Sequence, residues 1–291
     1  MAAKHFPFVK GHGTQNDFLV IPDPDGTLDL HPRHVQQLCD RRTGLGADGV
    51  LRAVRSAFHP DAHAMAAEAE WFMDYWNPDG TQAQMCGNGI RLFSKVLAQE
   101  GHVVLSSRTA LPIATRAGVR HVRSTAAAPG WITVAMGQAL LPGPDTVTVH
   151  VGKLRWPAVH VDMGNPHAVI FVDNLDHAGS LATPPAVTPT SAYPHGVTVE
   201  FVVRKGPRHL AMRVHERGAG ETRSCGTGAC AAVAAVLHRA KAALPVTGDT
   251  ITFIVDVPGG RLLVTVHPDA AFELSGPAEI VAAGVSYHQQ P

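Results

Sequence analysis

Cysteine is scarce in this sequence. Its 291 residues include four cysteines, Cys39, Cys86, Cys225 and Cys230, which are too few and too scattered for a disulfide framework in a chain of this length. No two of them form a C-x-x-C pair, so we expect neither a structural zinc site nor another metal site. In a reducing compartment all four should be free thiols.

The sequence also lacks long apolar runs and an excess of charge of one sign. No stretch approaches the roughly 18–20 apolar residues that span a bilayer, and the N-terminal residues lack the apolar core of a signal peptide. The 24 basic and 24 acidic residues balance without forming a basic tract, so neither nucleic acid nor a membrane is expected as a partner. We expect a soluble, cytoplasmic protein of two domains.

Cofactor motifs are missing as well. Gly11-His12-Gly13 and Gly44-Leu45-Gly46 fall short of a dinucleotide fingerprint, and no pyridoxal or nucleotide motif is present. The sequence therefore predicts chemistry on a small-molecule substrate without a cofactor.

Strand patterns far outnumber helix patterns. Apolar and β-branched runs bounded by Gly and Pro predict strands over residues 18–21, 103–106, 131–136, 146–151, 159–162, 168–172, 197–203, 211–215, 250–255 and 261–267. Helical spacing of apolar residues, or runs of alanine, predict helices over residues 32–41, 89–100 and 228–241. Many strands with few helices indicate an α+β fold.

One short pattern occurs twice. Met85-Cys86-Gly87-Asn88-Gly89 and Ser224-Cys225-Gly226-Thr227-Gly228 each place a cysteine at the glycine-rich entry to a predicted helix. The two cysteines are 139 residues apart, close to half the chain. This spacing favours a duplicated domain related by a pseudo-two-fold axis, with both cysteines facing one cleft.

A thiol at a helix N-terminus has distinctive chemistry. The helix end carries about half a positive charge and several unpaired N–H groups, which favour a thiolate. Flanking glycines leave those N–H groups open to a substrate carboxylate. Two such thiols could remove the hydrogen of an amino-acid α-carbon from one face and return a proton to the other, which inverts the stereocentre. Hydrogen bonds to the carboxylate and exclusion of water would then stabilise the carbanion.

Other interpretations of the cysteines stay open. A buried cysteine is most often a small apolar side chain, which suits Cys39 and Cys230. A redox protein could cycle Cys86 and Cys225 through a disulfide, although such a protein would usually carry a C-x-x-C pair. In an epimerase the same disulfide would inactivate the enzyme reversibly. A non-catalytic amino-acid binder would tolerate the loss of one thiol. Hydrolase chemistry is disfavoured because it needs one nucleophile rather than two mirrored ones.

The sequence resembles diaminopimelate epimerases nearly from end to end. The blocks that carry the resemblance are Lys10-Gly11-His12-Gly13-Thr14-Gln15-Asn16-Asp17-Phe18, Asp40-Arg41-Arg42, Gly46-Ala47-Asp48-Gly49, Asn77-Pro78-Asp79-Gly80, Met85 to Arg91, Met163-Gly164-Asn165-Pro166-His167, Val214 to Gly228, Pro258-Gly259-Gly260 and Ser275-Gly276-Pro277-Ala278. The resemblance implies two pseudo-symmetric domains, each a mixed or antiparallel β-sheet wrapped around a central helix. It places one domain at residues 1–137 with 277–291, the other at 138–276, and the active site in the cleft between them.

The resemblance also implies a function and a set of site residues. The family interconverts L,L- and meso-diaminopimelate on the route to lysine and peptidoglycan, without a cofactor, typically as a homodimer. Cys86 and Cys225 would be the acid/base thiols, with His167 beside Cys86 and Glu216 beside Cys225. The substrate-binding residues would be Asn16, Asn77, Gly87, Asn88, Asn165, Thr198, Arg217, Gly226 and Thr227.

Three positions depart from the family pattern. Thr198 stands where the family usually has an asparagine at the distal end of the substrate, and a threonine lacks the two-sided hydrogen bonding of the amide. Pro78 follows Asn77 where a small residue is usual, and Trp76 precedes it. These departures leave an alternative open, in which a paralogue epimerises or racemises a different amino acid.

Overall fold

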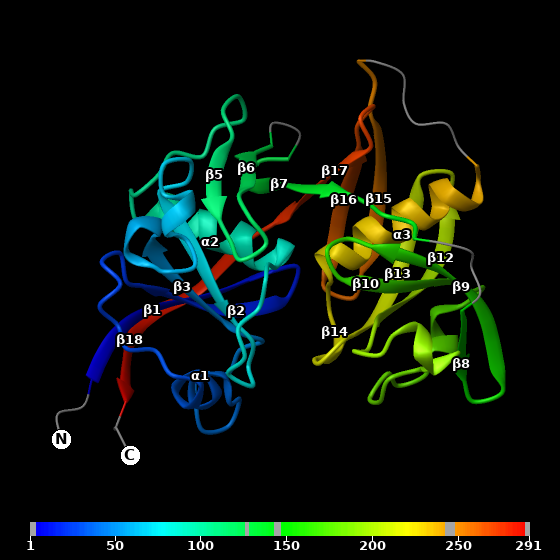
Figure 1. The fold of residues 1–291 in the computed structure, drawn as a ribbon, viewed down its shortest axis with the longest axis horizontal. Helices are drawn as coiled ribbons and strands as arrows, with labels where there is room; N and C mark the ends of the chain where they lie inside the picture. Colours follow the sequence, from blue (N-terminus) through cyan, green and yellow to red (C-terminus); the bar gives the residue numbers. More distant parts are fainter. Residues whose placement is uncertain (1–3, 126–127, 143–146, 242–247, 289–291) are drawn as a thin grey trace. The chain divides into compact units, whose positions relative to one another are not determined.

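The structure is a computed structural model that describes residues 4–125, 128–142, 147–241 and 248–288. The chain forms two compact units, Met1–Val134 with Pro277–Pro291, and Ala135–Gly276. We call them unit 1 and unit 2 and describe each by itself. In each unit a long β-sheet accompanies one central helix, α2 in unit 1 and α3 in unit 2 (Figure 1).

Unit 1 contains a mixed sheet formed from both ends of the chain. In spatial order its strands are β18 (Glu279–His288), β1 (Lys4–Gly13), β2 (Asn16–Pro22), β3 (Val50–Arg55), β4 (Trp71–Trp76), β5 (Leu111–Ala114), β6 (Arg120–Ser124) and β7 (Trp131–Gln138). The β2–β3 and β4–β5 pairs are parallel and the others are antiparallel. Helix α2 (Gly87–Gln99) packs on β1, β2, β3 and β18, and α1 (Pro32–Cys39) connects β2 to β3.

Unit 2 contains a second mixed sheet. Its strands run in the order β9 (Leu154–Asp162), β10 (Pro166–Phe171), β12 (Thr198–Gly206), β13 (His209–Glu216), β15 (Ile251–Val257), β16 (Gly260–Val266) and β17 (Ala271–Pro277), with β10–β12 and β13–β15 parallel. Strands β8 (Thr148–Val151) and β11 (Ala186–Thr188) extend the sheet beyond β9, and β14 (Gly220–Thr222) pairs with β13. Helix α3 (Gly226–Arg239) packs on β9, β10, β12 and β16.

The two units repeat one topology. From β1 to β7 in unit 1, and from β9 to β17 in unit 2, successive pairs are antiparallel, parallel, antiparallel, parallel, antiparallel and antiparallel. In both units the central helix lies, in sequence, between the fourth and fifth of these strands. The prediction of an α+β fold with two pseudo-symmetric domains is therefore confirmed.

Burial of the central helices explains their composition. Along α3 the residues from Ala229 to Val236 are all buried, and most of them are alanine or valine. A helix that is apolar on every side is buried on every side, and small side chains let the surrounding strands approach it. Along α2 the buried face includes Ile90, Leu92, Phe93 and Leu97. Both helices are therefore fixed in position by their sheets.

Some predicted boundaries change. The predicted strand 103–106 is wrong, because this segment is irregular and Val104 is 86% exposed. Of the predicted strand 146–151, Thr146 lies outside the described residues. The helices predicted from Gly89 and Gly228 begin two residues earlier. Short 3-10 turns occur at Ser56–Phe58, His63–Met65, Leu175–Ala178 and Thr190–Ala192.

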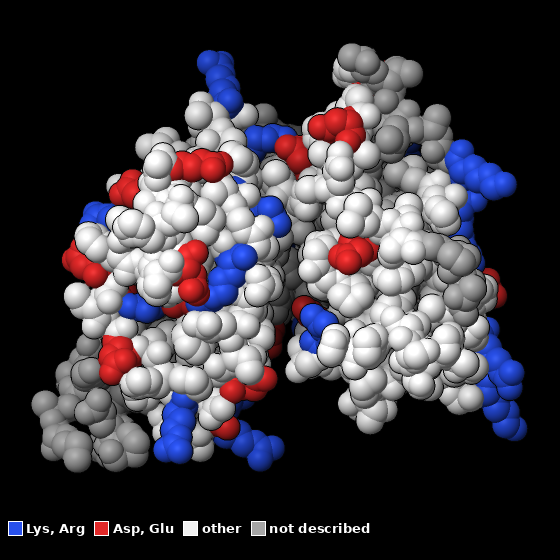
Figure 2. All heavy atoms as spheres, viewed as in Figure 1, with Lys and Arg blue, Asp and Glu red and all other residues white. Residues whose placement is uncertain are grey.

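Acidic and basic side chains are interspersed on the face of the molecule seen in Figure 2. Within the part of the chain that the structure describes, no helix is both long and apolar enough to cross a membrane.

Candidate active site

Cys86 and Cys225 have the same local structure in their respective units. Each is the N-cap residue of its helix, with an extended backbone (φ −140° and ψ 121° at Cys86, φ −125° and ψ 117° at Cys225). Each Sγ accepts a hydrogen bond from the backbone N–H three residues later, that of Gly89 or Gly228, at 3.4 Å. The thiol thus takes the place of the usual Ser or Asp oxygen at an N-cap and lies at the positive end of the helix dipole.

In unit 1 the Cys86 thiol lies at one end of a hydrogen-bonded chain of amides. Cys86 Sγ donates to Asn16 Oδ1 at 3.7 Å, and Asn88 Nδ2 donates to the same oxygen at 3.1 Å. Asn88 Oδ1 accepts from Arg91 Nη2 at 2.9 Å, and Asn16 Nδ2 donates to Asp48 Oδ2 at 2.8 Å. Asn16, Asn88 and Arg91 are all buried.

The ends of this chain fix the orientation of both amides. An arginine can only donate, so it selects the oxygen of Asn88. An ionised carboxylate can only accept, so Asp48 selects the nitrogen of Asn16. The remaining oxygen of Asn16 faces Cys86, which is therefore the donor in that contact. The thiol form of Cys86, rather than the thiolate, makes this hydrogen bond.

The tight β1–β2 turn brings Asn16 to the helix. Thr14 and Gln15 both adopt positive φ angles, 50° and 61°. Two consecutive residues in this region are typical of the two-residue hairpin turns in which Gly and Asn are usual. Gln15 thus adopts a backbone conformation that glycine adopts more readily than other residues. Gly13 adjoins the turn closely, since a Cβ there would lie 2.8 Å from the carbonyl oxygen of Asn88.

In unit 2 the surroundings of Cys225 are acidic. Its Sγ lies 3.5 Å from Thr227 Oγ1. Burial raises the pKa of the Cys225 thiol well above its usual range, and the charges of Glu216 and Glu200 raise it further, whereas the contacts with Thr227 and the Gly228 N–H lower it. Glu216 is held at the end of β13 by Thr222 Oγ1, which donates to its Oε2 at 2.8 Å. The structure thus brings Glu216, Thr227 and Cys225 into one neighbourhood.

His167 belongs to the same unit and is fully buried on β10. Its Nδ1 lies 2.6 Å from Oε1 of Glu200, which is fully buried on the neighbouring parallel strand β12. Burial raises the pKa of Glu200, while the charge and the hydrogen bond of His167 lower it. Glu200 was not among the predicted site residues.

The other predicted substrate-binding side chains differ in their exposure. Arg217 follows β13 and is exposed, with Nη1 3.5 Å from the carbonyl oxygen of His195, rather than buried as a clamp. Thr198 is buried, and its hydroxyl accepts from the Arg217 N–H at 3.2 Å. Asn165 is half-buried in the β9–β10 turn. Asn77, in unit 1, donates through Nδ2 to Thr81 Oγ1 at 3.0 Å.

The positions beside Asn77 differ in character. Trp76 is 9% exposed and belongs to the unit 1 core with Leu19, Ile21 and Val50. Pro78 is exposed. Trp76 therefore packs the sheet, and Pro78 shapes the loop that carries Asn77.

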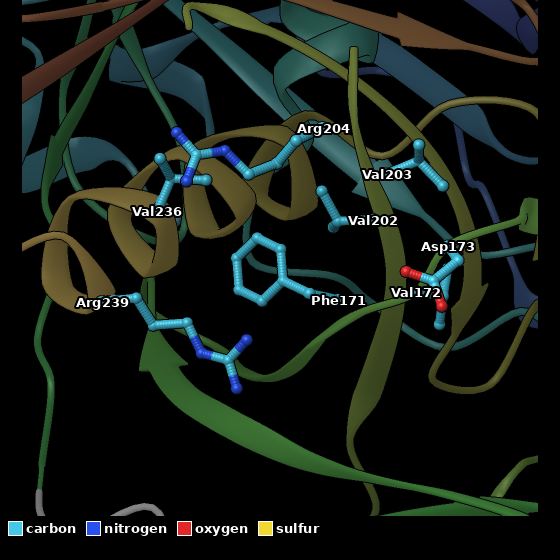
Figure 3. Close-up of a pocket in the computed structure, with 8 residues that line it drawn as sticks. All are labelled: Phe171, Val172, Asp173, Val202, Val203, Arg204, Val236 and Arg239. Carbon is cyan, nitrogen blue, oxygen red and sulfur yellow. The ribbon is translucent and has the colours of Figure 1, made fainter. Parts of the chain in front are cut away.

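Unit 2 also contains a pocket that lies away from Cys225. This pocket of about 350 Å³ lies in unit 2 near the C-terminal end of α3 (Figure 3), and it is lined by Phe171, Val172, Asp173, Val202, Val203, Arg204, Val236 and Arg239. It includes none of the predicted site residues, because Cys225 caps the opposite end of this helix. Among the described residues no group of three or more His, Cys, Asp and Glu side chains could hold a metal ion.

Solved structures share this fold. A phenazine biosynthesis protein of the PhzF family from Bacillus anthracis superposes with a TM-score of 0.69 at 17% identity, covering 98% of this chain and 100% of that one. A hydroxyproline epimerase from Agrobacterium vitis, with bound trans-4-hydroxy-L-proline, also gives 0.69, at 14% identity and over 98% and 92% of the two chains. The fold is thus that of a class of two-domain proteins that includes epimerases.

Sequence comparison narrows this class to one family. The profile of the family described as diaminopimelate epimerase matches residues 8–141 and 159–281. A protein of Streptomyces coelicolor named diaminopimelate epimerase is 58% identical over 95% of this chain and 94% of its own length. A Thermobifida fusca protein of the same name is 44% identical over 95% and 96%. The chain belongs to the diaminopimelate epimerase family and is an isomerase.

Proposed function

We propose that this chain interconverts L,L- and meso-diaminopimelate without a cofactor, using the Cys86 and Cys225 thiols as opposed acid and base. The proposed domains are residues 1–137 with 277–291 and residues 138–276. The matched N-cap geometry of the two thiols carries this proposal, since inversion needs one proton-transfer group for each face of the α-carbon. The substrate follows from the names of relatives as similar as 58% identical.

The proposed binding mode uses the helix ends. The first-turn N–H groups of Gly87, Gly226 and Thr227 have no partner within their helices and would donate to the substrate carboxylate next to the reacting carbon. Asn16, Asn88 and Asn165 would complete this set. Arg217, Asn77 and Thr198 would hold the distal amino-acid group, in which a guanidinium suits a carboxylate.

The proposed reaction moves two protons. His167 would accept the proton of Cys86, and Glu216 that of Cys225. One thiolate removes the α-hydrogen, and the resulting carbanion, held by the hydrogen bonds to its carboxylate, takes a proton from the opposite thiol. The reverse reaction exchanges these two roles, so one pair of thiols serves both directions.

Proton NMR of L,L-diaminopimelate in D₂O with the reduced protein tests reaction and substrate together. The proposal predicts loss of the α-proton signal as meso product forms. An unchanged signal, with free thiols demonstrated, would exclude diaminopimelate as the substrate. The same measurement on other amino acids would then identify the one whose α-proton exchanges.

Thr198 provides a test of the alternative that the chain is a paralogue acting on a different amino acid. Thr198→Asn should raise kcat/KM for diaminopimelate by about tenfold if the chain acts on another amino acid, because one distal hydrogen bond contributes about 1–2 kcal/mol. In a diaminopimelate epimerase adapted to threonine, the same variant should gain nothing. Initial rates of both proteins on L,L-diaminopimelate decide between the two.

Assembly and location complete the proposal. We propose a homodimer in the cytoplasm, on the basis of the family resemblance. Light scattering of the purified protein should give twice the 30.8 kDa mass of the chain.

A further inference from the structure

In addition to Cys225 and Glu216, unit 2 contains two titratable side chains that are buried in contact with each other. His167 Nδ1 and Glu200 Oε1 are 2.6 Å apart, and both side chains are 0% exposed. Among the described residues, neither His167 Nε2 nor Glu200 Oε2 has a hydrogen-bond partner. Buried polar groups are normally paired, so these two atoms are available to a further hydrogen-bond partner.

The helix above this pair is shaped to fit Glu200. A Cβ atom at Gly228 would lie 2.7 Å from Glu200 Oε1 and 3.3 Å from Cys225 Sγ. A residue larger than glycine at this position would therefore require the Glu200 carboxylate to move away from the first turn of α3. The Gly228 N–H in turn donates to Cys225 Sγ. Glu200, His167 and the capped thiol thus belong to one packed arrangement.

The charge of the pair indicates what it does. A carboxylate beside a neutral imidazole has a net charge of −1, which is unfavourable in a fully buried position. One added proton makes the pair neutral overall, whether the proton is closer to Oε1 or to Nδ1. The pair as a whole is therefore a better proton acceptor than an isolated buried histidine, which would become charged on accepting a proton.

We propose that Glu200 is a positioning residue for proton transfer: it holds His167 by Nδ1, leaves Nε2 as the acceptor, and with His167 takes up the proton that a thiol of the proposed site releases. This inference rests on the proposed function, in which His167 serves Cys86. In the transfer, the Cys86 S–H bond breaks, its electron pair stays on sulfur, and the proton binds Nε2 while Glu200 Oε1 hydrogen-bonds the Nδ1–H. The thiolate then removes the substrate α-hydrogen. A carboxylate that orients a catalytic histidine is a recurring arrangement.

Alkylation of the two thiols tests this role without any substrate. The reduced protein is treated with iodoacetamide near neutral pH, and the Cys86 and Cys225 peptides are quantified by mass spectrometry in the same sample. The thiolate is the reactive form, so each rate follows the thiolate fraction. Glu200→Gln should lower the Cys86 rate about tenfold and leave the Cys225 rate unchanged or higher, because a charge that disfavours the Cys225 thiolate is lost.

A matched variant controls for general loosening of unit 2. His209 Nε2 and Asp256 Oδ2 are also 2.6 Å apart in this unit, but both side chains are 34% exposed. Asp256→Asn should leave the ratio of the two alkylation rates unchanged. Opened packing in Glu200→Gln would raise both rates together, and that result, or an unchanged ratio, would overturn the proposal.

A double-mutant cycle on epimerisation gives a second readout. Glu200→Gln and His167→Gln should each lower kcat with little change in KM, and the double variant should be no slower than the slower single variant, because the two residues act as a unit. Multiplying effects would contradict the proposal. Glu200→Asp, which keeps the carboxylate, should restore part of kcat. If the parent protein does not epimerise diaminopimelate, the proposed function fails, whereas the alkylation ratio still tests the pair.

Discussion

Units 1 and 2 surround the same capped thiol with different neighbours. In unit 1 the sulfur of Cys86 faces the amide oxygen of Asn16, within a chain of neutral amides that ends at Arg91 and Asp48. In unit 2 the sulfur of Cys225 faces the hydroxyl of Thr227, and the charges of Glu216 and Glu200 raise the pKa of its thiol. The two units therefore share the backbone geometry of the capped cysteine and differ in the side chains around its sulfur.

The same contrast recurs at the second strand of the repeated topology, β2 in unit 1 and β10 in unit 2. Asn16 begins β2 and His167 lies near the start of β10, which are equivalent strands in the repeated topology. Each side chain is held by an acid, Asn16 by Asp48 at 2.8 Å and His167 by Glu200 at 2.6 Å. In each unit a carboxylate thus holds a polar side chain on this strand, an amide in unit 1 and an imidazole in unit 2.

Removal of either thiol should have the largest effect. Cys86→Ala and Cys225→Ala should each lower kcat/KM for epimerisation by about 10³-fold or more. In each variant one face of the α-carbon lacks its only proton-transfer group, and general acid–base catalysis contributes about 10²–10⁴-fold. Initial rates followed by NMR measure this. Near-normal activity in either variant would contradict the two-thiol account and reduce the two caps to structural features.

The two cap glycines should respond differently to the same substitution. Gly228→Ala should lower kcat/KM about 10–100-fold, because its Cβ would lie 2.7 Å from Glu200 Oε1. At Gly89 the nearest atoms, on Cys86 and Leu51, would be 3.4 Å away, which is ordinary contact. Gly89→Ala should therefore keep activity and gain up to about 1 kcal/mol in the free energy of unfolding from helix propensity. Equal losses in both variants would show that the caps do not differ in this way.

A thiol without a helix cap gives the smallest predicted effect. Burial raises the pKa of Cys39 from 9.0 to about 12. Between these values the folded state keeps a proton that the unfolded state loses, so this contribution to stability is fully present below pH 9 and is lost as pH rises toward 12. Cys39→Ala should flatten the fall in unfolding free energy over this range by up to about 1.4 kcal/mol per pH unit. Urea titrations at several pH values measure the slope, and an unchanged slope would contradict burial of this thiol.

The starts of the two central helices were the part of the fold that the sequence predicted best. The doubled cysteine and glycine pattern predicted the two helix entries, because cap residues are set by the backbone within a few positions. The pairing of β1 with β18 joins the two ends of the chain and depends on contacts that no local pattern specifies. Val104 shows the reverse error, since it belongs to a short β-branched run that is irregular, and its own side chain is exposed.

The carboxylates that hold Asn16 and His167 were harder to predict from the sequence than the two thiols. Asp48 and Glu200 act across strands, so their roles depend on register rather than on neighbouring residues. Glu200 did leave one signal, a lone acid within the apolar run 197–203, where burial of a charge demands a partner. The identity of that partner required the parallel pairing of β10 with β12.

Isotope placement in the first turnovers tests the central claim most directly. L,L-diaminopimelate is converted in D₂O to a few per cent, and the α-position is analysed in both product and remaining substrate. Two opposed thiols predict deuterium at the inverted carbon of nearly every product molecule, because the returned proton comes from a thiol equilibrated with solvent, while the remaining substrate stays largely protiated. Protium retained at the inverted carbon would mean that one group carries the hydrogen between faces, and would contradict the assignment of Cys86 and Cys225 to opposite sides.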